Sequence, residues 1–315
     1  MDDTRYAEIY RPCGRYLRQK GGQKMKLDPK IVVILAALFC SFSAIFVRFS
    51  TAPSVTMAAY RMGLASLILL PAILKGHTKE LKNIDKKTLL LCLINGVFLG
   101  LHFATYFESL KHTSVASAVV LVDTQVIFVA LIMWLVMKEK IPFKGIIGIV
   151  LTLGGSVIIA LSDKSGGGSN VLYGDLLALA GSVLFAFYAS IGYVARKNLS
   201  TTAYTFILYF VAFITLTLIS FITGDGMTGY GYMNVFWALM LAIFPTMLGH
   251  SLYSWSLKFV SPVFMSTAVL LEPVFSTIMA VFLFKEIPVM LQISGIIIII
   301  AGVATYSMAK DGTSE

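Results

Sequence analysis

Apolar residues along this chain gather in runs of about 20, and short polar segments separate them. A run of this length can cross a hydrocarbon core about 30 Å thick as an α-helix. The pattern predicts an all-α integral membrane protein with ten transmembrane helices. We place them near residues 31–50, 54–75, 88–110, 113–137, 143–162, 172–195, 202–223, 234–257, 261–284 and 288–309.

The second half of the chain repeats the first. Residues 109–155 recur without a gap as residues 256–302, so that a shift of 147 positions pairs Tyr106 with Tyr253. The same shift superimposes a Lys-Glu pair and two glycines of each copy. An internal repeat of this length predicts two homologous halves of five helices each.

The repeat and the composition of the segments around it set the domain boundaries. We expect a basic, disordered extension over 1–25, a first repeat over 26–162, a Gly/Ser linker over 163–171, a second repeat over 172–310 and a short tail over 311–315.

The Lys and Arg residues indicate the orientation of the chain. With the N-terminus in the cytoplasm, 20 of the 25 basic residues fall on the inner side and four on the outer side. Without the basic extension and the residues just after it, the ratio is still 12 to 4, so the positive-inside rule predicts that both termini are cytoplasmic. We expect the protein in the cytoplasmic (inner) membrane.

Five is an odd number of spans, so the second repeat should enter the membrane inverted relative to the first. Inverted repeats related by an axis in the membrane plane are typical of secondary transporters. Such proteins bind substrate near the midplane and expose it to either side in turn. The repeat therefore favours an alternating-access transporter.

The chain resembles the ten-helix EamA-type branch of the drug/metabolite transporter superfamily over about residues 26–310. The resemblance is carried by the paired repeats and by four motifs: Leu271-Glu272-Pro273-Val274, Phe284-Lys285-Glu286, Tyr60-Arg61 and Thr113-Ser114-Val115-Ala116-Ser117. It implies transport of small metabolites such as amino acids or their derivatives, more often by export. One feature departs from the pattern: the first repeat has Gln125-Val126 where the second has Glu272-Pro273. Without that proline, a symmetric break of both helices is not predicted.

Composition narrows the function further. The net charge of +9 comes from the tail and the loops, so we expect no nucleic-acid partner. The three cysteines lack metal-ligand or disulfide spacing, and we expect no metal, no cofactor and no enzymatic activity. The expected partners are a small-molecule substrate and the lipid bilayer. Proton coupling stays open, as does the choice between a monomer and a homodimer.

Three polar residues fall near the middle of the fourth and ninth spans. These are Asp123, Gln125 and Glu272, and the repeat register makes Gln125 and Glu272 equivalent. Ionisable groups inside spans are costly and often functional, so substrate or proton handling is one interpretation. The alternative for Glu272 is structural: it could bond a backbone group freed by Pro273 or neutralise Arg61.

Arg61 lies about 10 Å inside the second span, too deep to reach the interface easily. We expect a carboxylate partner among Glu108, Asp123 and Glu272, which would make Arg61 half of a structural ion pair. The alternative is an anion clamp on a substrate carboxylate.

Two histidine–tyrosine pairs lie on equivalent helices. His102 and Tyr106 share one face of the third span, and His250 and Tyr253 share one face of the eighth. Together with Trp255 they could line a substrate cavity, or the histidines could simply bond neighbouring helices.

Two other classes of protein are weaker alternatives. A membrane sensor or scaffold would not transport, and an intramembrane protease would use Asp123 and Asp175. Tyr173-Gly174-Asp175 lacks the expected GxGD context, which disfavours the protease.

Overall fold

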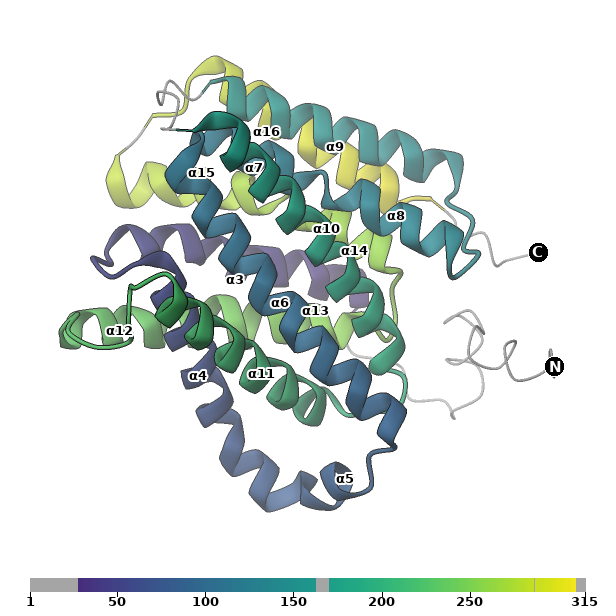
Figure 1. Ribbon diagram of the computed structural model, residues 1–315. Helices are drawn as coiled ribbons and strands as arrows, with labels where there is room; N and C mark the ends of the chain where they lie inside the picture. Colours follow the sequence, from purple (N-terminus) through teal and green to yellow (C-terminus); the bar gives the residue numbers. More distant parts are fainter. Residues whose placement is uncertain (1–27, 163–169, 286, 310–315) are drawn as a thin grey trace.

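The fold consists of helices that cross one another in a layered bundle (Figure 1). It is given by a computed structural model that describes residues 28–162, 170–285 and 287–309, and no strand occurs within these ranges. The predicted extension over 1–25, most of the linker over 163–171 and the tail over 311–315 lie outside the described residues.

Within these described ranges, ten helical segments are long and apolar enough to cross a membrane, and each matches one predicted span. In the first half they are built from α3 (Pro29–Arg48), α4 (Ser54–Ala72) with η1 (Ile73–His77) and α5 (Thr78–Lys82), α6 (Lys86–His112), α7 (Val115–Asp123) with α8 (Gln125–Leu135), and α9 (Phe143–Leu161). In the second half they are α10 (Val171–Ala195), α11 (Thr201–Ile222), α12 (Tyr232–Leu241) with η2 (Ala242–His250) and α13 (Ser251–Ser256), α14 (Pro262–Val269) with α15 (Glu272–Phe284), and α16 (Met290–Ser307).

Short polar side chains begin many of these helices. Each accepts a hydrogen bond from a backbone N–H of the first turn, which has no partner within the helix. The residues in this role are Asp28, Asp85, Ser114, Asn170, Ser200 and Ser261. The polar segments between the apolar runs therefore determine where the spans start.

The fourth and ninth spans are both interrupted at equivalent positions. Thr124 separates α7 from α8, and Leu270 and Leu271 separate α14 from α15. The sequence did not predict a symmetric break, because the first repeat lacks the proline. In the first half the break falls at Thr124, the equivalent of Leu271, where the Thr124 hydroxyl donates to the Leu121 carbonyl at 2.5 Å and contacts Ser182 at 3.0 Å. Both spans also end alike, on the left-handed residues Lys138 and Lys285.

The equivalent helices α9 and α16 pack against each other in antiparallel directions (Figure 1). A Cβ added to Gly148 would lie 2.8 Å from the Gly302 carbonyl, and one added to Gly155 would lie 2.7 Å from the Gly295 carbonyl. The repeat register makes Gly148 equivalent to Gly295 and Gly155 to Gly302. These contacts are therefore reciprocal, as a two-fold relation requires, and they are consistent with inverted repeats.

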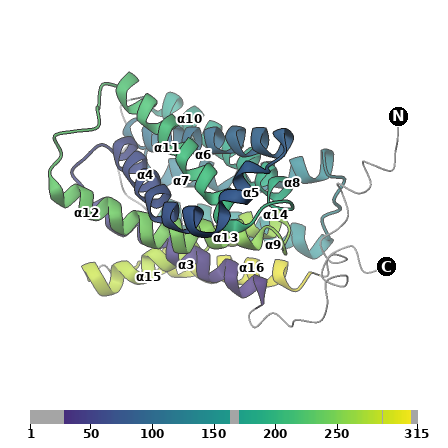
Figure 2. The same cartoon turned by 90° about the horizontal axis from the view of Figure 1, so that it is seen from below.

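Other contacts follow the same exchange of halves. α10 packs against α6. In the exchanged pair, α3, the repeat equivalent of α10, packs against η2 and α13, which belong to the repeat equivalent of α6. The second and seventh spans meet through α4 and α11. Figure 2 shows α15, α3 and α16 along one edge of the bundle. The described ends of the chain meet, since the Lys30 ammonium bonds the Ser307 carbonyl.

Candidate functional site

Arg61 lies in the interior of the bundle and binds hydroxyl groups. Its side chain is 2% exposed, and its guanidinium lies 4.7 Å from the centre of the Phe103 ring. Nε donates to Thr246 Oγ1 at 3.0 Å and Nη1 donates to Ser43 Oγ at 3.3 Å. The predicted carboxylate partner is not found at ion-pair distance within the described residues, where Nη2 has no hydrogen-bond partner at all.

The π-helix η2 places Thr246 against Arg61. Pro245 has no N–H to give the Leu241 carbonyl in an α-helical pattern, and the backbone takes the i→i+5 pattern of a π-helix here. The Thr246 hydroxyl also donates to the Leu241 carbonyl, at 2.9 Å. The Thr246 carbonyl in turn accepts a hydrogen bond from Tyr209 at 3.2 Å. The wider turn of η2 thus fixes a hydroxyl that accepts from a buried cation, and π-helical turns often mark functional sites.

The four predicted His and Tyr residues belong to one aromatic cluster around Phe103. The His250 ring meets Phe103 edge-on, with ring centres 5.6 Å apart, and contacts Tyr253 at 6.2 Å. His102 stacks with Tyr106 at 6.4 Å and contacts Phe103 at 5.3 Å. The structure therefore brings together residues of the third span, in the first half, and of the eighth span, in the second half.

The two histidines differ in their hydrogen bonds. His102 Nδ1 lies 2.9 Å from the Gly181 carbonyl, so this histidine bonds a neighbouring helix. His250 Nδ1 is buried and has no partner among the described residues. Trp255 does not take part in the ring contacts of this cluster; its ring lies 4.6 Å from Phe259.

The predicted carboxylates lie at the two helix breaks. Asp123 ends α7 and accepts a short hydrogen bond from Ser156 on α9. Glu272 begins α15, and the Tyr253 hydroxyl lies 3.4 Å from its Oε1. Gln125 begins α8, and its Oε1 is buried without a partner in the described part of the chain. All three therefore present polar atoms where the spans are interrupted.

Two other acidic residues are occupied elsewhere. Glu108 bonds Lys111 at 2.8 Å and His112 at 3.2 Å on its own helix, so it is not the partner of Arg61. Asp175 accepts hydrogen bonds from Thr113 and Ser117, both at 2.7 Å, near the start of α7. Asp123 is six residues further along, about 9 Å at the helical rise, so Asp123 and Asp175 do not form a shared-proton dyad.

Sequence patterns did not predict several residues that contact the candidate site. Phe103 could have been found, because the shift of 147 makes it the equivalent of His250. The hydroxyls that bind Arg61 and Asp123 gave no signal, since Ser and Thr are common in apolar spans. These residues are Ser43, Ser156 and Thr246.

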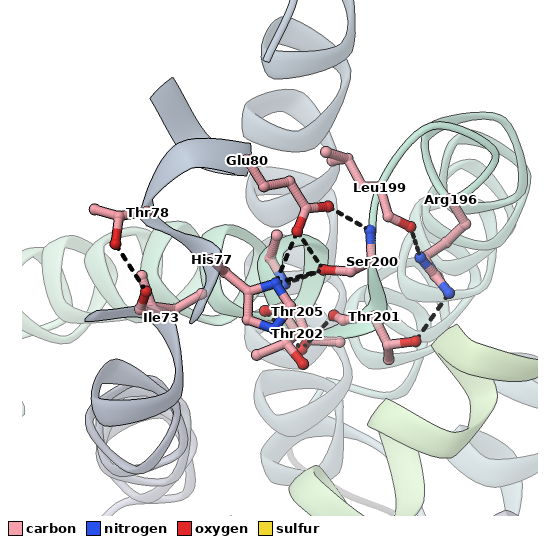
Figure 3. A network of polar contacts seen from close by, with 11 residues as sticks. Ile73, His77, Thr78, Glu80, Arg196, Leu199, Ser200, Thr201, Thr202 and Thr205 are labelled. Atoms are coloured by element: carbon pink, nitrogen blue, oxygen red, sulfur yellow. Dashed lines mark hydrogen bonds and ion pairs between the residues drawn. The ribbon is translucent and has the colours of Figure 1, made fainter. Parts of the chain in front are cut away.

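A second polar network connects the two halves at the N-terminus of α11 (Figure 3). The Glu80 carboxylate accepts from Ser200 N–H at 2.6 Å and from the Ser200 hydroxyl at 2.7 Å, and His77 Nδ1 lies 2.8 Å from Glu80 Oε2. Arg196 donates to Thr201 Oγ1 at 2.9 Å and to the Ser254 carbonyl at 2.8 Å. Burial lowers the pKa of the Arg196 guanidinium from its ordinary value.

No group of three or more His, Cys, Asp or Glu side chains suited to a metal ion occurs in the part of the chain that the structure describes. Cys40 and Cys92 are buried free thiols, and Cys13 lies outside the described residues.

Comparison with known proteins gives consistent matches. The model of the EamA-like transporter family matches residues 30–161 and again residues 172–308, which correspond to the two repeats. A protein of Clostridium kluyveri named "Uncharacterized transporter" is 29% identical over 264 residues, covering 81% of this chain and 84% of that protein. One of Archaeoglobus fulgidus with the same name is 26% identical, covering 89% and 97%. The "Uncharacterized transporter YyaM" of Bacillus subtilis is 25% identical, covering 79% and 83%.

A solved structure shares the fold. Its TM-score is 0.74 with 18% sequence identity, and the match covers 89% of this chain and 96% of that chain.

Proposed function

Because this chain belongs to the EamA-like transporter family and is a multi-pass membrane transporter, we propose that it exports small metabolites such as amino acids or their derivatives. It acts in the cytoplasmic (inner) membrane with both termini in the cytoplasm. The two repeats alternate between conformations that open a central site to one side and then to the other.

The observation that carries this proposal is the contact between Phe103 and His250. The two residues are repeat equivalents, and their rings are 5.6 Å apart. A residue that touches its own equivalent lies beside the axis that relates the halves. In an inverted-repeat transporter that axis runs near the bilayer midplane, where substrate binds. Arg61 and the carboxylates at the helix breaks supply polar groups around this point.

The substrate-binding residues of this proposal come from both halves. Aromatic walls with a few fixed polar groups are typical of small-molecule sites. The proposed substrate-binding residues are His102, Tyr106, Asp123, Gln125, His250, Tyr253 and Glu272, with Arg61 as an anion clamp. Trp255 stays a predicted site residue at the edge of this set.

Exchange in liposomes tests the proposal. Purified full-length protein in vesicles loaded with an unlabelled amino acid should accumulate the same labelled amino acid from outside. We expect Asp123→Asn or Glu272→Gln to change the rate or its pH dependence, because each removes a carboxylate at a helix break. Asp225→Asn, in the loop between the seventh and eighth spans, is the matched control.

Two results would contradict the proposal in different ways. Wild-type rates at every pH in both variants would exclude the assigned carboxylates. An absence of exchange for every amino acid and derivative tested would exclude the proposed class of substrate.

A further inference from the structure

The buried guanidinium of Arg61 lacks a complete set of partners. Two of its nitrogens donate to hydroxyls, whereas Nη2 has no partner within the described residues. The side chain is 2% exposed, so water in the surrounding medium does not solvate it freely. A guanidinium presents parallel N–H donors that match the two oxygens of a carboxylate. The repeat equivalent of Arg61 is Leu208, so the second half carries no cation at the corresponding position.

A second unpartnered nitrogen lies beside the same aromatic ring. His250 is 9% exposed, its Nδ1 has no partner in the described chain, and its ring meets Phe103 edge-on. Arg61 lies over the same Phe103 ring at 4.7 Å. Within the described residues, Arg61 Nη2 from α4 and His250 Nδ1 from η2 are therefore two buried nitrogen atoms without partners, on side chains that contact the same ring.

The nearby acidic groups limit which anions fit. Glu272 adjoins this cluster through Tyr253, whose ring contacts His250 and whose hydroxyl lies 3.4 Å from Glu272 Oε1. Asp123 ends α7 at the equivalent break of the fourth span. A simple anion would add net negative charge next to these carboxylates in a medium of low dielectric constant. A ligand that carries an ammonium group together with its carboxylate adds no net charge, and Glu272 can receive the ammonium.

We propose that Arg61 Nη2 and His250 Nδ1 form the carboxylate subsite, and Glu272 the ammonium subsite, of a site for zwitterions. This inference rests on the proposed transport function and assigns the two ends of its substrate to named groups. The Tyr253 hydroxyl, 3.4 Å from Glu272 Oε1, orients the acidic side of the site.

A thermal-shift experiment with matched probes tests both subsites. The full-length protein is titrated with each of the twenty common amino acids as the free acid, as the carboxamide and as the N-acetyl acid. The carboxamide lacks the carboxylate, and the N-acetyl acid lacks the ammonium group. We expect at least one free acid to stabilise the protein, and its two derivatives to bind about 10- to 100-fold more weakly.

Substitutions should remove one preference at a time. Arg61→Gln should abolish the preference for the free acid over its carboxamide. Glu272→Gln should abolish the preference for the free acid over the N-acetyl acid. If Arg61→Gln does not fold, His250→Phe keeps a ring against Phe103, deletes Nδ1 and should weaken the same preference. Arg48→Gln, at the end of α3, is a control that should keep both.

Equal binding of an acid and its amide, or unchanged preferences in Arg61→Gln and His250→Phe, would overturn the subsites. Stabilisation by no free acid would overturn them as well. None of these three results decides whether the protein transports, because liposome exchange with other metabolites measures transport separately.

A different observation concerns the network around Glu80 (Figure 3). Glu80 belongs to the first half, and Ser200 is the N-cap of α11 in the second half. The carboxylate accepts both the N–H and the hydroxyl of Ser200, which are charge-assisted hydrogen bonds. It also lies at the positive end of the 22-residue helix α11. The Glu80 carboxylate, with the His77 ring 3.2 Å from the same Ser200 hydroxyl, thus joins the two halves at this face.

We infer that the bonds between Glu80 and Ser200 form a latch that must release whenever this face opens. This rests on the proposed alternating access and needs no substrate for its test. Cys92 on α6 serves as a native reporter, since it is fully buried in a helix that packs against α11, whose N-cap is Ser200.

The test uses Cys13→Ser, Cys40→Ser protein, in which Cys92 is the remaining thiol. In detergent, maleimide should react with Cys92 about tenfold faster or more in Glu80→Ala, because two charge-assisted bonds are lost. Ser200→Ala should give a smaller increase, and Lys79→Ala, one residue away and exposed, should give none. Each variant must melt within a few degrees of its parent, which separates opening from unfolding. Equal rates in Glu80→Ala and its parent would overturn the latch.

Discussion

Thr246 connects a backbone defect to a buried charge. Pro245 removes one donor from the eighth span, and next to it the Thr246 hydroxyl both donates to the Leu241 carbonyl and accepts from Arg61 Nε. A hydroxyl can do both because it carries one donor and two acceptor lone pairs. The position of Arg61 therefore depends on a neighbouring helix and not on its own.

Thr246→Val should destabilise the protein. Valine has nearly the same shape but leaves the Arg61 Nε without its acceptor and removes the hydroxyl bond to the Leu241 carbonyl, so we expect a loss of about 1–3 kcal/mol. Thermal unfolding in detergent measures it. Thr305→Val is the control, since Thr305 is half-buried and, among the described residues, donates to the Ala301 carbonyl of its own helix. Equal melting temperatures of the two variants would contradict this account.

For single residues, sequence reasoning found the charged groups but not their partners. Arg61 and Glu272 stood out because charges are rare within apolar spans. Their partners are decided by which helix faces which, and the hydroxyls of Ser43 and Thr246 occupy positions where a carboxylate was expected for Arg61.

Between elements, glycine decides how closely α9 and α16 approach. Gly155 meets the Gly295 carbonyl directly, whereas the neighbouring Gly154 has open space where a Cβ would lie. Without a hydrophobic driving force between helices in lipid, such close backbone contact supplies much of the association.

Gly155→Ala should therefore cost stability and Gly154→Ala should not. A Cβ at Gly155 would lie 2.7 Å from the Gly295 carbonyl and the two helices would have to separate, at about 1–3 kcal/mol. At Gly154 we expect no loss and a gain of at most about 1 kcal/mol from helix propensity. Thermal unfolding of the two variants side by side gives the comparison, and equal losses would show that this contact is not specific.

The break in the fourth span illustrates the limit of motif reasoning for elements. Proline is a strong signal of a broken helix, so its absence pointed away from a break. The structure nevertheless interrupts both spans at equivalent positions. At the first break the Thr124 hydroxyl bonds the Leu121 carbonyl and Ser182 of α10, whereas Pro273 follows the second. The symmetry of the fold is thus kept by different local chemistry in each half.

At the scale of the whole molecule, the two repeats should face opposite sides of the membrane. Lys138 and Lys285 are repeat equivalents and both adopt a left-handed conformation at the end of a span. The antiparallel packing of α9 and α16 is consistent with inversion. Equivalent residues of inverted repeats lie on opposite sides of the membrane.

Cysteines placed singly at Lys138 and Lys285, in protein without native cysteines, should therefore label differently in intact cells. An impermeant maleimide should react with the cysteine at 285 from outside, and with the cysteine at 138 only after permeabilisation. The positive-inside rule gives the sign, since more Lys and Arg residues surround position 138. Labelling of both from the same side would exclude inverted repeats.

The sequence by itself determined the class of the fold, the ten spans and the division into two repeats. These properties depend on the length of apolar runs and on internal similarity, which the chain carries locally. Only the tertiary structure decided that Arg61 binds Thr246, that His250 lies beside Phe103 and that Glu80 meets Ser200. Those contacts join residues more than 100 positions apart, so they depend on how helices pack in three dimensions, which no local pattern records.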